Sequence, residues 1–116
     1  MLWRRSRREY LKHREAARAL VHARLNHFNT FYKFPLKKVF IKNHKSRWGS
    51  CSERGNLNFN YKLVFLPTEI VDYIIVHELC HLAEFNHSPA FWAQVAKVLP
   101  DHVALRKNLR RLERVR

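Results

Sequence analysis

Apolar side chains recur at helical spacing near the start of the chain, on a background rich in Arg and Ala and free of Gly and Pro. The recurring positions are Leu11, Ala16, Leu20, Ala23 and Phe28. They predict a long helix over residues 6–31, which Pro35 would end because proline cannot continue a helix. Nine basic residues lie between Arg4 and Lys33, so we expect the other face of this helix to be solvated.

Shorter apolar stretches in the next part of the chain predict strands. Residues 39–41 have the composition of a short strand, and residues 57–61 alternate apolar and polar side chains as a half-buried strand does. Between them, residues 46–52 are expected to form a loop or a sheet edge, and Gly55 marks a turn. The apolar run then continues through residues 63–66.

Residues 68–85 are apolar nearly all round, which predicts a helix buried in the core. Pro67 suits the start of this helix, and Glu69 would lie near the positive end of its dipole. The apolar positions are Ile70, Val71, Ile74, Ile75, Val76, Leu79 and Leu82.

Two further helices are expected after the buried one. Ser88 is a good helix cap, and Pro89 suits the first helical position after it. Pro100 would end that helix, and a basic helix follows over residues 102–115. The length allows one core and one domain, residues 1–116.

The buried helix contains an H-E-x-x-H sequence formed by His77, Glu78 and His81. Positions four apart lie on one helix face, so both imidazoles can reach one metal ion at about 2.0–2.1 Å. Glu78 lies beside that metal, where it can take a proton from a metal-bound water. Burying two histidines and a carboxylate in an apolar helix is costly unless they are paired or bound to metal. The pattern therefore favours a metal site over two core histidines.

A hydrolytic zinc usually has three protein ligands and one open position. His87 is the favoured third ligand, because its spacing matches the long H-E-x-x-H-x-x-G-x-x-H motif. Glu84 stands where that motif has glycine, so we expect Asn86, which tolerates left-handed geometry, to turn the chain. A carboxylate further along, Asp101 or Glu113, is the less favoured alternative.

These ligands predict a mechanism for a zinc-dependent hydrolase. Three neutral histidines leave the full charge of Zn²⁺ at the site and lower the pKa of bound water toward about 7. Glu78 would take that proton and later return it to the leaving group. Glu84 and Asn86 are candidates for supporting contacts to the site. The candidates for stabilising an oxyanion are Arg47, Tyr61, His44 and His102.

The charge of the chain adds possible partners to this site. The net charge is +14, from 23 Lys plus Arg against 9 Asp plus Glu, and such an excess attracts nucleic acid, nucleotides or acidic proteins. No apolar run is long enough to span a membrane, and no apolar signal core follows the basic start, so we expect a cytoplasmic protein. Cys51 and Cys80 are expected to be reduced rather than paired.

Four motifs, in this order and spacing, resemble the YgjP-like metallopeptidase family. They are Ser-Arg-Trp-Gly-Ser-Cys at residues 46–51, Asn-Leu-Asn-Phe-Asn at 56–60, His-Glu-Leu-Cys-His-Leu at 77–82, and Asn-His-Ser-Pro-x-Phe-Trp at 86–92. The resemblance extends over roughly residues 39–100. The SprT-like proteases, which act near DNA, are more distantly similar through His-Glu-Leu-Cys-His alone.

The resemblance implies an α+β, zincin-like fold. A small antiparallel or mixed sheet would pack on the active-site helix, beside a long N-terminal helix and C-terminal helices. It also implies one zinc ion per chain on His77, His81 and His87, with Glu78 catalytic, and it assigns Glu84 to the family pattern. Family members usually carry a β-rich region ahead of the first helix, and this chain is expected to be a catalytic core without it.

Three functions follow, in descending order. The first is a metallopeptidase that binds peptide as an extra strand along an exposed sheet edge, for which residues 56–61 are the candidate. The second is a metal-dependent phosphohydrolase that acts on nucleotides attracted by the positive charge. The third is a nucleic-acid-binding module with structural zinc. The third is least favoured, because H-E-x-x-H leaves a coordination position open and Glu78 would have no structural task.

Overall fold

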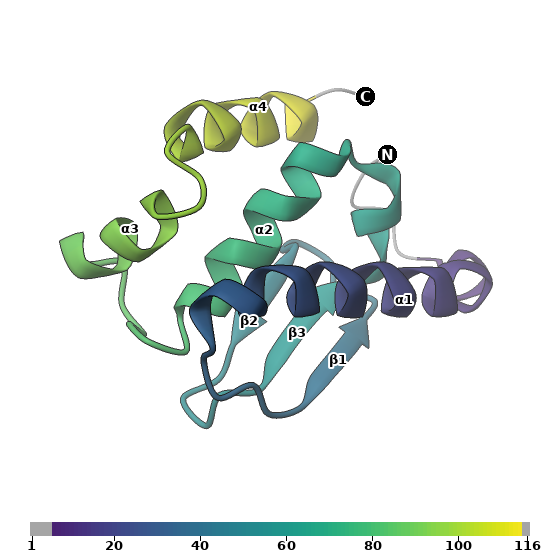
Figure 1. The fold of residues 1–116 in the computed structure, drawn as a ribbon. Helices are drawn as coiled ribbons and strands as arrows, with labels where there is room; N and C mark the ends of the chain where they lie inside the picture. The colour runs from purple at the N-terminus through teal and green to yellow at the C-terminus, as the bar shows by residue number, and fades with distance from the viewer. Residues whose placement is uncertain (1–5, 115–116) are drawn as a thin grey trace.

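The computed structural model describes residues 6–114 (Figure 1). In chain order the elements are α1 (Arg7–Tyr32), β1 (Val39–Lys42), β2 (Gly49–Cys51), β3 (Leu57–Asn60), the 3-10 helix η1 (Tyr61–Phe65), α2 (Thr68–Cys80), α3 (Pro89–Ala96) and α4 (His102–Arg114). Two helices, α1 and α2, pack on the small sheet, and two more, α3 and α4, pack against α2. The expected α+β architecture, with a long first helix and C-terminal helices, is confirmed.

α1 is the predicted long helix, and both of its ends are capped. The hydroxyl of Ser6 accepts a hydrogen bond from the Glu9 amide at 3.2 Å, which satisfies one of the free N–H groups of the first turn. At the other end Lys33 is left-handed, with φ of 58°, and donates its N–H to the Asn29 carbonyl. The buried positions repeat every fourth residue: Ala17, Val21 and Leu25.

The sheet is mixed, and β3 is its central strand. β1 runs parallel to β3, and β2 runs antiparallel to it, which gives the order β1-β3-β2. The prediction that residues 56–61 form an exposed edge is therefore wrong, because both sides of β3 are paired. Alternation of apolar residues reports which face of a strand is buried, not which strands lie beside it.

The chain leaves the sheet earlier than the predicted strand over 57–61. β3 ends at Asn60, whose side-chain oxygen accepts a hydrogen bond from the Lys62 N–H at 3.0 Å and caps η1. Asparagine offers the backbone such a local bond in competition with a sheet ladder. As a result Tyr61 and Leu63 turn into the core, where both are fully buried.

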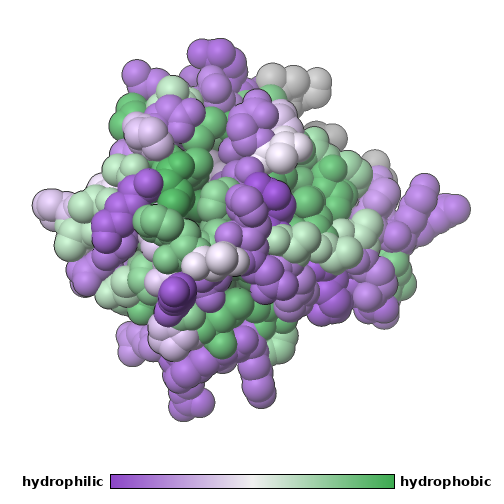
Figure 2. Space-filling model, in the orientation of Figure 1, coloured by the Kyte–Doolittle hydropathy of each residue, from purple (hydrophilic) through white to green (hydrophobic). Residues whose placement is uncertain are grey.

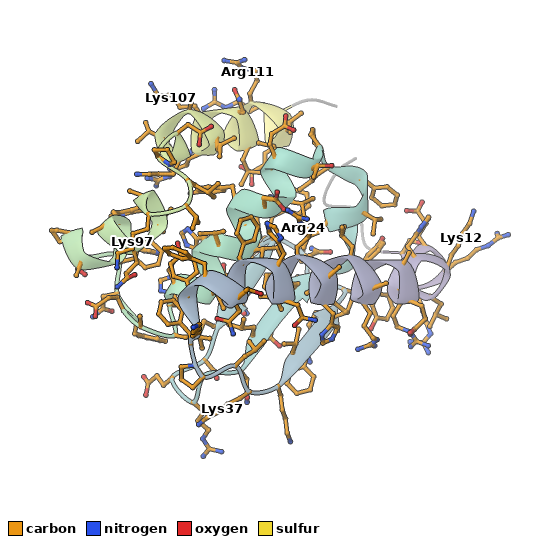
Figure 3. The ribbon with its side chains drawn as sticks, in the orientation of Figure 1. Lys12, Arg24, Lys37, Lys97, Lys107 and Arg111 are labelled. Atoms are coloured by element: carbon orange, nitrogen blue, oxygen red, sulfur yellow. The ribbon has the colours of Figure 1, made fainter. Side chains whose placement is uncertain are left out.

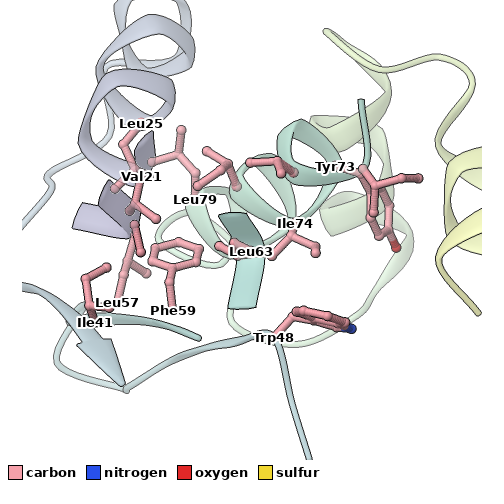
Figure 4. Packing of buried hydrophobic residues seen from close by; sticks show 14 of the residues in the cluster. Val21, Leu25, Ile41, Trp48, Leu57, Phe59, Leu63, Tyr73, Ile74 and Leu79 are labelled. Atoms are coloured by element: carbon pink, nitrogen blue, oxygen red, sulfur yellow. The ribbon is translucent and has the colours of Figure 1, made fainter. Parts of the chain in front are cut away.

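The core lies between the sheet and the helices α1 and α2. Leu57 and Phe59 of β3 point toward Val21 and Leu25 of α1, and Leu79 of α2 lies beside them (Figure 4). Burying side chains of this size contributes about 1.5–3 kcal/mol each relative to exposure. The predicted apolar helix is thus confirmed as a core helix, through Ile70, Val71, Tyr73, Ile74, Ile75 and Leu79.

α3 and α4 begin where the sequence predicts. The Ser88 hydroxyl accepts a hydrogen bond from the Phe91 N–H at 3.3 Å, and Pro89 is the first residue of α3. α4 begins at His102 as expected. Residue 115, its predicted last residue, lies outside the described part of the chain.

On the face seen in Figure 2, hydrophilic residues project around the outline and apolar residues gather between them. Lys107 and Arg111 extend from α4 away from the rest of the molecule (Figure 3). Arg24 instead connects two helices, because its guanidinium donates hydrogen bonds of 2.7 and 2.9 Å to Asp72 of α2.

Both cysteines are free thiols, as expected. Within residues 6–114, none of the helices has the length and apolar character needed to cross a membrane.

Candidate metal centre

His77 lies in the last turn of α2, and His81 directly follows the end of that helix. Their spacing of four positions places both imidazoles on one side, with ring centroids 5.1 Å apart. The remaining faces of α2 pack against α1, β2, α3 and α4. The helix cannot rotate without exposing apolar side chains, so the core fixes the direction of both histidines.

α2 ends at Cys80 rather than at the predicted residue 85, and this early end turns the chain back toward His77. The N–H groups of residues 82 and 83 bond to carbonyls three positions back, at 3.0 and 3.1 Å, as in a 3-10 turn. Within residues 6–114, Lys33 is the only non-glycine residue with a positive φ. The prediction that Asn86 turns the chain in left-handed geometry is therefore wrong.

The turn brings three imidazoles together. Nε2 of His87 lies 3.0 Å from Nε2 of His77 and 3.1 Å from Nε2 of His81. Three nitrogens bound tetrahedrally to one zinc ion at about 2.0–2.1 Å would lie about 3.4 Å apart, so the arrangement fits one ion after a small outward movement. Among residues 6–114, no other group of histidine, cysteine or carboxylate side chains could hold a metal in this way.

A hydrogen bond fixes the proton of His81 on the nitrogen that faces away from the cluster. Its Nδ1 lies 3.1 Å from the backbone carbonyl oxygen of Glu84. A carbonyl only accepts, so Nδ1 carries the proton and Nε2 presents a lone pair, as a metal ligand must. Glu84 thus supports one of the three histidines through its backbone, whereas the prediction gave no indication that the carbonyl would do so.

Aromatic rings pack around the three histidines. Phe91 stacks on His81 with centroids 4.4 Å apart and meets His77 edge-on at 5.1 Å. Trp92 stacks on His87 at 5.9 Å. Nδ1 of His77 is buried and has no hydrogen-bond partner in the described chain, so packing orients this ring.

Burial also sets the charge state of two of these imidazoles. It lowers the pKa of His77 to about 3, and the charges of His81, His87 and Arg106 act in the same direction. Burial likewise lowers the pKa of His81. Both rings are therefore neutral near pH 7, which is the form that binds a metal ion.

Glu78 lies beside the histidines with only 7 % of its surface exposed. The backbone of Gly49 packs against it so closely that a Cβ at this position would lie 3.0 Å from Cγ and 3.3 Å from Oε2 of Glu78. Burial raises the pKa of Glu78 to about 8, and the charge of Arg47 opposes that rise. A carboxyl group with a pKa in this range can accept and return a proton near neutral pH.

Two hollows meet at Glu78. One, of about 260 Å³, lies between residues 46–49, α2 and α4. The other, of about 360 Å³, lies between β2 and residues 85–87 and reaches all three histidines. Gly49, His77 and Glu78 line both hollows. Together the hollows form a cleft that crosses the candidate metal centre.

The structure separates the predicted helper residues. Arg47 lines the first hollow and Asn86 lines the second. Tyr61 is fully buried and packs on Tyr10 of α1, with ring centroids 5.5 Å apart. It does not line the cleft, so the prediction that it stabilises an oxyanion is wrong. The predicted strand over residues 57–61 includes Tyr61, but the strand ends at Asn60, and Tyr61 begins the 3-10 helix that turns into the core.

The other candidates lie outside the cluster. Glu113 accepts a hydrogen bond of 2.8 Å from the Trp48 indole, and Asp101 is exposed in the turn immediately before α4. Neither joins the histidines, so the favoured alternative, His87, is the one that the fold brings to the site. His102 stacks on Trp92 at 5.2 Å and is separated from His87 by that ring.

Three residues of the site are not among those that the sequence predicts. Gly49 is one of only two glycines in the chain, and this scarcity was the available signal for a close backbone contact. Trp92 belongs to the 86–92 motif, which gives no indication that its ring stacks on His87. Arg106 reaches the site only because α4 packs on α2, and no local sequence pattern predicts that packing.

Comparison with known proteins supports a metallopeptidase fold. A family model described as "YgjP-like, metallopeptidase domain" matches residues 3–112. Among curated proteins, none matches the chain. The crystal structure of the metallopeptidase zymogen abylysin from Pyrococcus abyssi superposes with a TM-score of 0.69 at 27 % identity, covering 77 % of this chain and 90 % of that one.

A second solved structure shares the fold. The metallopeptidase zymogen jannalysin from Methanocaldococcus jannaschii superposes with a TM-score of 0.61 at 23 % identity, covering 84 % of this chain and 94 % of that one. The expected zincin-like architecture, with a small mixed sheet beside an active-site helix, agrees with both structures.

Proposed function

Because the chain belongs to the YgjP-like metallopeptidase family, we propose that it is a zinc-dependent peptidase. In this proposal His77, His81 and His87 hold one zinc ion, and Glu78 transfers the proton. The observation that carries it is the convergence of three Nε2 atoms, 3.0 and 3.1 Å apart, beside a buried carboxyl group.

The donor set suits zinc. Three neutral imidazoles satisfy three of the four positions that zinc prefers and leave one open for the reaction. When bound there, zinc would supply Lewis acidity, which polarises a carbonyl oxygen and makes water more acidic. The Glu84 carbonyl holds His81 in the required tautomer, and Phe91 limits the movement of two of the rings.

In the proposed reaction Glu78 acts as both base and acid. Its carboxylate takes a proton from the attacking water and then gives it to the leaving amine of the cleaved peptide bond. Burial raises its pKa above that of an exposed carboxyl group, which strengthens the carboxylate as a proton acceptor. Gly49 supports this role, because the absence of a side chain lets the carboxyl group remain in its position.

β2 is the sheet edge beside the site. It pairs with β3 on one side, and its three residues, Gly49–Cys51, line the hollow that contains the histidines. A peptide could add to this edge as a further strand, because main-chain hydrogen bonds recognise any extended chain. This edge replaces residues 56–61 as the expected place for substrate.

The test compares cleavage of a denatured protein by the zinc-loaded chain and by Glu78→Gln. We expect cleavage to fall by about 10²–10⁴-fold, as removal of a general base does, while zinc content stays near one ion per chain. Glu69→Gln is the matched control, since this exposed residue lies in the first turn of the same helix. Its activity and zinc content should equal those of the unchanged chain.

Other outcomes would overturn the proposal. Release of phosphate or pyrophosphate from nucleoside triphosphates, lost in Glu78→Gln and without peptide cleavage, would establish the phosphohydrolase. Salt-dependent DNA binding that survives in Glu78→Gln, with no turnover of either substrate, would identify a nucleic-acid-binding module. Failure of the purified chain to take up zinc would remove the basis of every hydrolytic mechanism considered.

A further inference from the structure

The hollow between residues 46–49 and α4 carries unpaired positive charge. Arg47, Arg106 and Arg110 line it, and Glu113 is the one acidic residue there besides Glu78. The Glu113 carboxylate already accepts a hydrogen bond from the Trp48 indole. Within residues 6–114, none of the three guanidinium groups forms an ion pair.

Arg24 shows how this chain neutralises an arginine when the charge has only a structural role. Its guanidinium lies against Asp72 in a two-pronged ion pair. Among the described residues, the three arginines around the hollow have no such carboxylate partner, and their charges repel one another. An anion bound among them would relieve that repulsion, and the planar guanidinium group suits a carboxylate in particular.

The rest of the hollow is apolar. Trp48, Tyr73, Ile74 and Leu109 line it, with exposed fractions between 3 % and 9 %. Apolar walls below a positively charged rim match a side chain that has an aliphatic stem and a negatively charged end. The volume of about 260 Å³ lies below the ~300–1,000 Å³ of pockets that enclose drug-sized ligands. It therefore suits one side chain better than a whole nucleotide.

The hollow opens onto the reacting groups, because Gly49, His77 and Glu78 also line it. A peptide extended along β2 points alternate side chains to opposite faces, so a residue beside Gly49 can direct its side chain into the hollow. We propose that the hollow binds a glutamate or aspartate side chain of a peptide substrate, adjacent to the bond that is cut. This inference rests on the peptidase function proposed above.

Arg106 and Arg110 are the specificity-determining residues in this proposal. Both come from α4, one helical turn apart, whereas Arg47 also acts on Glu78 electrostatically. Arg106 is held over the Trp92 ring, 5.7 Å from its centroid. Arg111 and Lys107 lie on the same helix but do not line the hollow, which makes them matched controls.

The experiment uses the zinc-loaded full chain and starts from the cut sites that mass spectrometry identifies in a denatured protein. Synthetic peptides around one cut site then carry Glu, Gln or Lys at the residue next to the bond. We expect kcat/KM for the Glu peptide to exceed that for the Gln peptide by about ten- to a hundredfold, the range for hydrogen bonds to a charged group.

The variants separate recognition from general damage. Arg106→Gln combined with Arg110→Gln should bring the Glu and Gln peptides to similar kcat/KM values. Arg110→Glu should favour the Lys peptide. Arg111→Gln and Lys107→Gln should keep the preference for Glu, and zinc content with far-ultraviolet circular dichroism checks that every variant is folded.

Failure of this inference differs from failure of the peptidase proposal. Equal cleavage of the Glu and Gln peptides, with both activities lost in Glu78→Gln, would overturn the acidic preference and leave the peptidase intact. A preference that persists in the double variant, or is lost equally in Arg111→Gln, would overturn the assignment to this hollow. Absence of any peptide cleavage would overturn both proposals.

Discussion

α2 and α4 are both 13 residues long and line the same hollow, but they are held in opposite ways. α2 buries nine of its residues and contains no lysine or arginine. α4 buries two, Leu105 and Leu109, and contains five basic residues. The residues proposed for chemistry are thus fixed by the core. Arg106 and Arg110, proposed for recognition, lie on a helix that a narrow stripe of apolar side chains holds to the core.

The largest expected effect is the loss of stability when a core leucine of α2 is truncated, compared with the equivalent truncation in α4. Leu79→Ala should lower the free energy of unfolding by about 3–5 kcal/mol, because Leu79 is fully buried and its removal leaves a cavity. Leu109→Ala should cost about 2 kcal/mol, since Leu109 borders an open hollow. Urea unfolding of both variants measures the difference. Equal losses would show that α4 belongs to the core as fully as α2 does.

Removal of zinc should lower the stability of the α2 side of the cleft and leave α4 unaffected. At about 100 times its dissociation constant, zinc should raise the free energy of unfolding by about 2.7 kcal/mol. His81→Ala should abolish this increase, while His22→Ala, at an exposed position on α1, should retain it. Hydrogen exchange with and without zinc locates the effect, which we expect over residues 77–87. Equal protection of α4 would contradict the separation of the two helices.

The smallest effect concerns the contact between β2 and Glu78. Gly49→Ala would place a Cβ 3.0 Å from Glu78 Cγ and 3.1 Å from the Asn58 carbonyl oxygen, so the carboxyl group must move. We expect kcat/KM to fall about tenfold, or about 1.4 kcal/mol, with zinc retained. Gly55→Ala is the control: its φ of 88° makes it costly for stability, but it does not contact Glu78. Unchanged activity in Gly49→Ala would show that Glu78 does not depend on this contact.

The parts of the site that the sequence predicted are those set by local periodicity. His77, Glu78 and His81 follow from helical spacing alone, and the three histidines lie together in the structure. Ser6 and Ser88 cap helices as predicted, because a cap depends on residues within one turn. Binding of zinc and catalysis by Glu78 stay predictions until they are measured.

The parts that the sequence did not predict depend on packing between distant segments. α2 ends at Cys80, although apolar residues continue past that position. A longer helix would have carried His87 away from His77 and His81. Strand order placed β2 rather than β3 at the edge. Arg47 and Arg110 line the same hollow, although no local sequence pattern around either residue predicts that the two lie close together.

The two sides of the cleft also differ in the length of chain that each must close. His77 and His87 are 10 positions apart, whereas the Trp48–Glu113 hydrogen bond joins residues 65 positions apart. At about 0.6 kcal/mol for each doubling, the longer closure costs about 1.6 kcal/mol more chain entropy. During folding, the histidine cluster can therefore assemble while α4 is still undocked. With α4 undocked, the chain would keep the three histidines together but lose the two arginines of α4 that are proposed to recognise the substrate.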